Sequence, residues 1–117
     1  MALRPTEFDG GVPVDGYGPG FFRVGGKVWR GPVIATPTGA RDWGGLDDVA
    51  ALTALAGRVD VLFLGLGAEI GRPPAALVAT LEAAGIAVEA MASPTAARSY
   101  NVTLSEGRRV ACALIPV

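Results

Sequence analysis

The feature that most constrains the fold is the alternation of short apolar runs with helical segments in the second half of the chain. Runs at 61–64, 86–91 and 110–115 predict strands. The first run is apolar at every position, as in a strand covered on both faces. Helical periodicity fills the two intervals between the runs. Strands that alternate with helices form a mainly parallel sheet with right-handed crossovers, so we expect an α/β domain.

Three helices are expected, and each is bounded by residues typical of helix ends. Asp47 can cap the first, and the second opens after Pro73 and Pro74. Ser93 is predicted to cap the third, with Pro94 at its first position, where the missing N–H of proline costs nothing. A glycine follows each helix, as left-handed C-terminal caps require: Gly57, Gly85 and Gly107.

A β-hairpin is predicted in the N-terminal half. Two strand-like runs, 21–24 and 27–30, flank the pair Gly25 and Gly26. A two-residue type I′ turn needs positive φ at both central positions, which glycine adopts without strain. The hairpin therefore adds antiparallel strands to the domain.

The hairpin is flanked by segments with weaker signals. Residues 1–16 are rich in Gly, Pro and Asp and are expected to form an irregular arm, so the domain is expected to occupy 17–117. After the hairpin, 33–35 predicts a third short strand, and 36–45 predicts a loop that contains Trp43. This tryptophan either covers the core or forms an exposed anchor for a partner.

The composition excludes several classes of function. Ten basic and eleven acidic residues give a formal net charge of −1. Nucleic-acid binding depends on a clustered basic excess, so we expect no nucleic-acid partner. The absence of histidine removes the commonest general base and transition-metal ligand. With no paired carboxylates at a suggestive spacing either, we assign no catalytic residue, no metal site and no cofactor.

The single cysteine, Cys112, cannot form an internal disulfide, as expected for a reducing compartment. It lies between two alanines in the last predicted strand, where a buried and inert thiol is expected. The N-terminus lacks the apolar stretch of a secretory signal. The most apolar run, 61–67, is far shorter than the roughly 20 residues that span a bilayer. We expect a cytoplasmic protein that does not insert into a membrane, although peripheral association stays open.

Gly65 and Gly67 follow a predicted strand inside a strand–helix–strand unit, where a dinucleotide-binding loop would lie. Glu89 even falls where the ribose-binding acid belongs. However, the third glycine, Gly71, is one residue too far along. The two prolines that open the next helix also delete N–H groups that a pyrophosphate would need. A tight turn is the favoured interpretation.

Four polar residues could converge on an anion. In an open α/β sheet, ligands bind beyond the carboxyl ends of the strands, and Arg72, Ser93, Thr95 and Arg98 all lie at such ends. Exposed or ion-paired arginines are the alternative, because surface charge pairs are common.

Three further polar residues occupy the last predicted helix. Asn101 is a mediocre helix former, so it and Tyr100 either bond to a neighbouring loop or line a pocket. Glu106 lies at the C-terminal end, where a carboxylate opposes the helix dipole by about 0.3–1 kcal/mol. Arg108 or Arg109 is the nearest candidate to compensate for it.

The C-terminal third carries a family resemblance. The blocks 93–101, 106–108 and 113–116 resemble those of a small domain family of unknown function found in bacteria and archaea. That family includes the mitochondrial assembly factor 3 of NADH:ubiquinone oxidoreductase (complex I) and the adipogenesis-associated domain protein. The likeness covers roughly 17–117. Family members often carry Cys where Ala97 stands, which argues against thiol chemistry at this position here.

The resemblance implies a three-layer α/β domain with a mixed central sheet and helices on both faces. It also implies an accessory protein that binds another protein and assists the assembly of a membrane complex, of the respiratory chain or of protein export. It establishes no enzymatic activity. The alternative is a small-molecule or anion-binding domain, or an enzyme, that uses the crevice at the strand ends.

Overall fold

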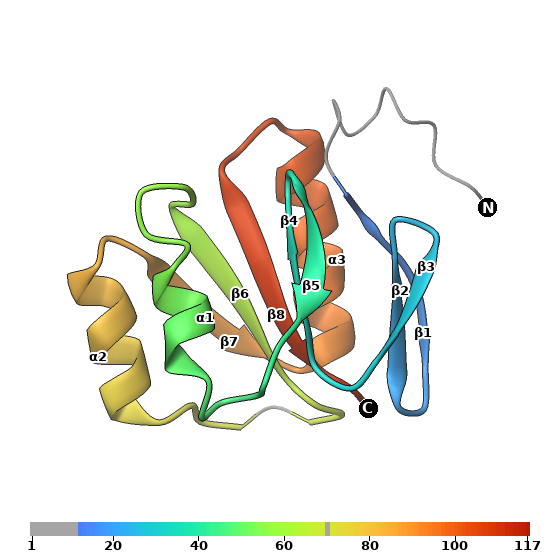
Figure 1. Ribbon diagram of the computed structural model, residues 1–117, viewed down its shortest axis with the longest axis horizontal. Helices are drawn as coiled ribbons and strands as arrows, with labels where there is room; N and C mark the ends of the chain where they lie inside the picture. Colours follow the sequence, from blue (N-terminus) through green and yellow to red (C-terminus); the bar gives the residue numbers. More distant parts are fainter. Residues whose placement is uncertain (1–11, 70) are drawn as a thin grey trace.

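The computed structural model describes residues 12–69 and 71–117, which form two sheets and three helices (Figure 1). The central sheet has the strand order β5-β4-β8-β6-β7. Strand β6 runs parallel to β7 and β8, whereas β4 runs antiparallel to β8 and β5. The sheet is therefore mixed, as the resemblance implies. Its strands are β4 (Val33–Thr36), β5 (Gly39–Asp42), β6 (Val61–Leu66), β7 (Ala87–Met91) and β8 (Val110–Ile115).

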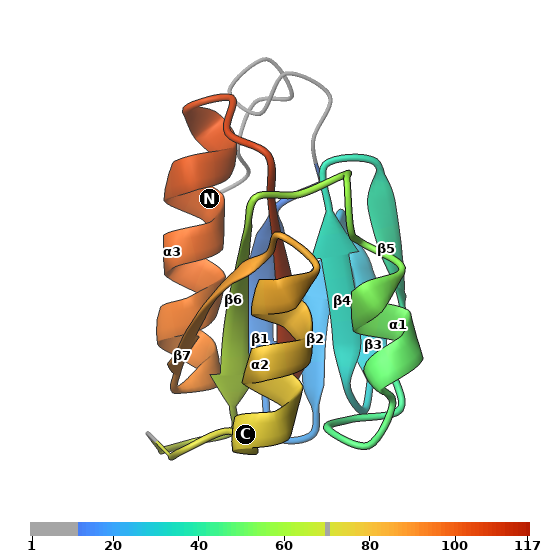
Figure 2. The same ribbon diagram turned by 90° about the vertical axis from the view of Figure 1, so that its left-hand side faces the viewer.

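Helices cover both faces of this sheet and make three layers (Figure 2). Helices α1 (Val49–Thr53) and α2 (Ala75–Ala83) pack on one face, and α3 (Ser93–Ser105) packs on the other. The alternation along β8 divides the core in two. Its alanines at 111 and 113 face α1 and α2, whereas Val110, Cys112 and Leu114 face α3.

The predicted hairpin is confirmed, but it belongs to a separate small sheet. Strands β1 (Val14–Gly18), β2 (Phe21–Val24) and β3 (Lys27–Arg30) pair in that order. Gly25 and Gly26 adopt φ of 60° and 81° in the turn between β2 and β3. The small sheet packs beside α3. Its residues Phe22 and Val24 belong to the core cluster that α3 forms with β8.

Two strands lie where the sequence predicts irregular structure. Strand β1 begins within the expected arm. Its two glycines, Gly16 and Gly18, disfavour a strand, but pairing with β2 stabilises it. Strand β5 occupies part of the loop expected at 36–45 and pairs with β4 through a turn at 37–38. The expectation for residues 1–11 lies outside the described residues.

Two predicted helix caps are wrong. Asp48, not Asp47, caps α1, and its carboxylate accepts hydrogen bonds from the N–H groups of Gly44 and Ala51. The residue that caps α3 is Ala92, which leaves the hydroxyl of Ser93 free for bonds elsewhere. The predicted glycines at 57, 85 and 107 do adopt positive φ.

Side chains of α3 hold the small sheet in place. The amide of Asn101 accepts a hydrogen bond from the N–H of Val14 at 2.9 Å and donates one to the carbonyl of Val14 at 2.6 Å. The hydroxyl of Tyr100 donates to the carbonyl of Val12 at 2.8 Å. These bonds replace strand pairing on the outer side of β1.

We expect Asn101→Ala to lower the free energy of unfolding by about 1–3 kcal/mol, because both partners on Val14 lose their bonds. Urea unfolding followed by circular dichroism measures this change. Val102→Ala, on the exposed side of the same helix, is the control and should change stability by less than about 0.5 kcal/mol. Equal effects of the two variants would contradict the tether.

Candidate functional site

Ser93 forms a buried junction between the ends of three elements. Its N–H donates to the carbonyl of Gly67 at 2.8 Å, and its hydroxyl accepts from the N–H of Gly67 at 2.9 Å. The same hydroxyl donates to the carbonyl of Ile115 at 2.5 Å. The end of β6, the start of α3 and the end of β8 are therefore joined through one side chain.

Gly65 and Gly67 allow Ser93 to pack against the end of β6. A Cβ on Gly65 would lie 2.6 Å from the Oγ and 2.7 Å from the Cα of Ser93, closer than atoms can approach. Gly67 adopts a φ of 98°, and its N–H is already bonded to Ser93. The tight-turn interpretation accounts for both glycines, and that N–H is not available to a pyrophosphate.

The four predicted crevice residues do not meet as one group. A guanidinium nitrogen of Arg98 donates to the hydroxyl of Thr95 at 3.3 Å, and both side chains are exposed. The hydroxyl of Ser93 is engaged in the buried junction. Arg72 is exposed and makes no hydrogen bond to the other three in the described part of the chain. An anion site from these residues stays a prediction.

Trp43 is buried and closes the core beside α1. Only 4% of its surface is exposed, and its ring N–H donates to the carbonyl of Asp48 at 3.2 Å. It packs in the cluster that contains Leu52 and Leu62. Of the two alternatives for this tryptophan, the structure shows the one in which it covers the core.

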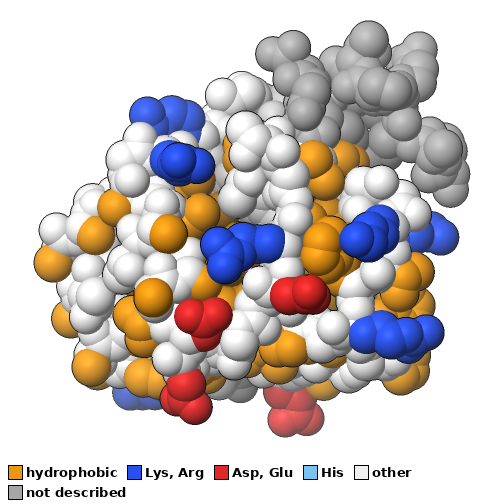
Figure 3. Space-filling model, viewed as in Figure 1, with side chains coloured by type: hydrophobic (Ala, Val, Ile, Leu, Met, Phe, Trp, Pro, Cys, Tyr) orange, Lys and Arg blue, Asp and Glu red, His pale blue; other side chains and the backbone are white. Residues whose placement is uncertain are grey.

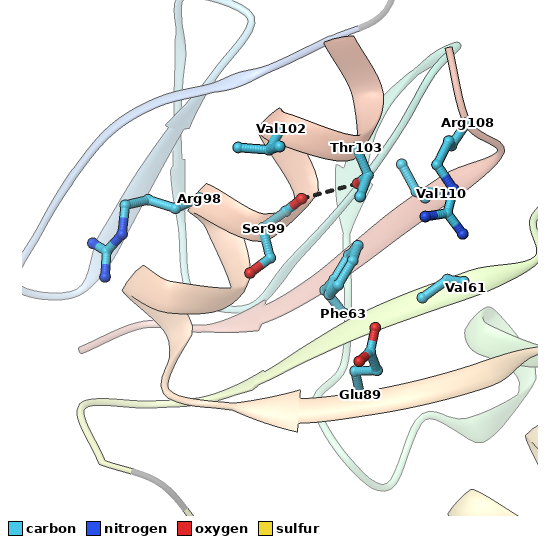
Figure 4. A pocket seen from close by; sticks show the side chains of 9 residues that line it. All are labelled: Val61, Phe63, Glu89, Arg98, Ser99, Val102, Thr103, Arg108 and Val110. Carbon is cyan, nitrogen blue, oxygen red and sulfur yellow. Dashed lines mark hydrogen bonds between the residues drawn. The ribbon is translucent and has the colours of Figure 1, made fainter. Parts of the chain in front are cut away.

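The ionic tether expected for Glu106 is not among the ion pairs of the described residues. Arg109 instead pairs with Asp60 at 3.3 Å and donates to the carbonyl of Gly57 at 3.1 Å. Backbone N–H groups at 106–108 satisfy the last carbonyls of α3. Arg108 points toward a surface groove that the sequence did not predict (Figure 4).

This groove lies between α3 and strands β6 and β7 (Figure 4). It exists because α3 packs over β6 and β8 and leaves the same face of β7 largely open. Its volume is about 390 Å³, within the size range of ligand pockets. It is lined by Val61, Phe63, Glu89, Arg98, Ser99, Val102, Thr103, Arg108 and Val110.

The groove combines an apolar floor with a few charged groups. Val61 and Phe63 form part of the floor, Glu89 projects from β7 toward Phe63, and Arg108 points in from the end of α3 (Figure 4). Arg98 extends away from the other labelled side chains. On α3, the wall includes Val102, which is 57% exposed. An exposed apolar wall beside charged side chains suits contact with another molecule.

The polar side chains that line the groove are Glu89, Arg98, Ser99, Thr103 and Arg108. Among the described residues, no group of three His, Cys, Asp or Glu side chains could hold a metal ion. Charges of both signs are scattered over the face shown in Figure 3, as the near-zero net charge predicts.

Burial keeps two ionisable groups neutral. Desolvation raises the pKa of the Cys112 thiol and of the Tyr100 hydroxyl well above their usual values. The thiol therefore stays protonated at neutral pH and is a poor nucleophile.

We expect Gly65→Ala to destabilise the protein by about 1–3 kcal/mol, because its Cβ would overlap the backbone of Ser93. Thermal unfolding measures the loss. Gly71→Ala is the matched control, since a Cβ there would lie 3.7 Å from Leu66, an ordinary contact. If both variants melt at the wild-type temperature, the close approach does not constrain the fold.

We also expect stability to fall at alkaline pH. Because the folded pKa values of Cys112 and Tyr100 are raised, their contribution is complete below the unfolded pKa values of about 8.5 and 10. It is lost as the pH rises above them. Urea midpoints from pH 7 to 10.5 test this, and Cys112→Ala should remove the part that begins near pH 8.5. Rapid reaction of the folded thiol with a disulfide reagent at pH 8 would contradict the inert assignment.

The sequence is similar over its whole length to known proteins. Over all 117 residues, the chain is 53% identical to an uncharacterised protein of Rhodobacter capsulatus and covers 94% of it. It is 29% identical to the zebrafish NADH dehydrogenase [ubiquinone] 1 alpha subcomplex assembly factor 3, with 99% of this chain and 71% of that protein covered.

A solved structure shows the same architecture. The crystal structure of a Bartonella henselae protein, called an outer membrane protein, matches with a TM-score of 0.81 at 33% identity. The match covers 91% of this chain and 95% of that one. Within the described residues, no helix of this chain has the length and apolar character that crossing a membrane requires.

Residues 14–115 match the model of the family described as protein of unknown function (DUF498/DUF598), and the chain belongs to this family.

Proposed function

We propose that this chain is an accessory protein of the cytoplasm that binds another protein while a membrane complex is assembled. The observation that carries the proposal is the alignment of nearly the whole chain with a protein named as an assembly factor of NADH dehydrogenase. The alignment covers 99% of this chain and 71% of that protein, so nearly the whole of this chain has a counterpart in the assembly factor.

The surface of the domain supports a binding role. The groove between α3 and β7 offers the exposed side chain of Val102 to a partner, with Glu89 and Arg108 beside it. Apolar surface rimmed by charge is typical of protein interfaces.

The test is site-specific photo-crosslinking in the native cell. A photoreactive residue replaces Val102, and the matched control carries it at Val28, another exposed valine that lies on β3. We expect position 102 to yield crosslinks to subunits of a respiratory or export complex, and position 28 to yield none.

Deletion of the gene provides the independent readout. We expect it to lower the amount of one fully assembled membrane complex on native gels, and the wild-type chain to restore that amount. Unchanged complexes in the deletion strain, together with no specific crosslink from position 102, would refute the proposal. Recovery of the chain outside the cytoplasm would refute the assigned compartment.

A further inference from the structure

The outer edge of β7 is unpaired in the described structure, and its backbone groups can be assigned. Strand β7 is the last strand of the central sheet and pairs with β6 alone. The N–H of Ala87 donates to the carbonyl of Asp60 at 2.9 Å, so the backbone groups of Ala87 face β6. Since these groups alternate sides along a strand, those of Val88 and Ala90 point outward. Two N–H and two C=O groups are therefore available to another strand.

The other strand edges are protected against such pairing. Strand β5 carries Arg41 and Asp42, and β3 carries Lys27 and Arg30. Strand β1 has an irregular register with β2 between Val14 and Gly16, and the side chain of Asn101 occupies the backbone groups of Val14 on the outer side. Charges, bulges and covering groups are the devices by which proteins block edge pairing.

Strand β7 has only one such device. Its register with β6 runs through five residues without a bulge, and its single charge is Glu89. This carboxylate projects toward the groove and takes part in no ion pair among the described residues. It does not block the edge, because the outward backbone groups belong to the neighbouring residues.

We propose that β7 binds an extended segment of a partner protein as an added strand, with a Lys or Arg of that segment opposite Glu89. The proposal rests on the proposed function in one respect, that the partner is a protein. Main-chain hydrogen bonds to Val88 and Ala90 supply affinity, and side-chain pockets supply specificity in this mode of recognition.

The groove provides that specificity. Alternate side chains of an added strand would point to the face where α3 leaves β7 uncovered. There an apolar side chain can reach Val102 and a basic one can pair with Glu89. Every second residue of the segment is thus expected to point toward α3, and these residues are expected to be apolar or basic.

A second copy of this chain is a poorer occupant. An antiparallel β7–β7 pair that uses both Val88 and Ala90 would be centred on Glu89. The two carboxylates would then lie directly opposite each other, and like charges in that position are destabilising. The same carboxylate therefore disfavours self-pairing and favours a basic partner.

The probe is a library of random twelve-residue peptides displayed on phage and selected on the full chain. We expect enrichment of sequences in which an apolar residue and a Lys or Arg stand two positions apart, so that both side chains point toward α3. Fluorescence anisotropy then gives the Kd of one selected peptide. Ala90→Pro removes an outward N–H without touching the bonds to β6 and should weaken binding at least tenfold.

Ala40→Pro is the matched control on the opposite edge of the sheet. The N–H of Trp43 donates to the carbonyl of Pro32, so by alternation the backbone groups of Ala40 also point outward. This variant should bind the peptide with the wild-type Kd. Glu89→Lys should weaken binding of the basic peptide at least tenfold and strengthen binding of its Glu-substituted counterpart.

Hydrogen exchange on the wild type tests the proposal even if Ala90→Pro does not fold. The amides of Val88 and Ala90 should exchange quickly in the free protein and at least tenfold more slowly with the peptide bound. Five outcomes would each overturn the proposal. The selection could yield acidic peptides, peptides without the two-residue spacing, or no enrichment at all. Exchange at these amides could stay unchanged, or the wild type could form a dimer that Ala90→Pro abolishes. Crosslinks from position 102 without binding at β7 would leave the proposed function standing and refute only this edge.

Discussion

The close approach of Ser93 to the end of β6 determines how the rest of the domain is arranged. Gly65 leaves room for the serine, and the serine hydroxyl joins the backbones of Gly67 and Ile115. A buried hydroxyl with partners for both its donor and its acceptor costs little and fixes geometry well. The junction fixes where α3 begins against the sheet, and packing on β6 and β8 fixes the direction in which α3 crosses it.

That direction has a consequence for the surface. Because α3 lies over β6 and β8, β7 is covered by α2 on one face only. Phe63 is kept almost fully buried, whereas Glu89 on the neighbouring strand is exposed. The groove thus results from the position of α3. The segment proposed to bind β7 would extend the central sheet by one strand at this edge.

Local signals in the sequence predicted much of the fold and little of the site. Gly25 and Gly26 specified the hairpin, and the apolar runs specified β6, β7 and β8, because period and turn chemistry act over a few residues. Strand β1 escaped prediction because its stability depends on the pairing with β2 and on bonds between Val14 and Asn101, 87 residues away. The groove escaped for a similar reason. It combines side chains from α3 and from strands β6, β7 and β8, and nothing in the spacing of Glu89 and Val102 reveals that they line one surface.

Residues 99–102 of α3 contact the N-terminal sheet on one side of the helix and line the groove on the other. Tyr100 and Asn101 bond to the segment that begins β1, while Ser99 and Val102 line the groove on the other side of the helix. A packed helix moves as a rigid body, so a shift of α3 that widens the groove would change the geometry of its bonds to Val12 and Val14. The N-terminal sheet is therefore mechanically connected to the groove, and its amide signals would register occupancy there although no residue of β1 lines it.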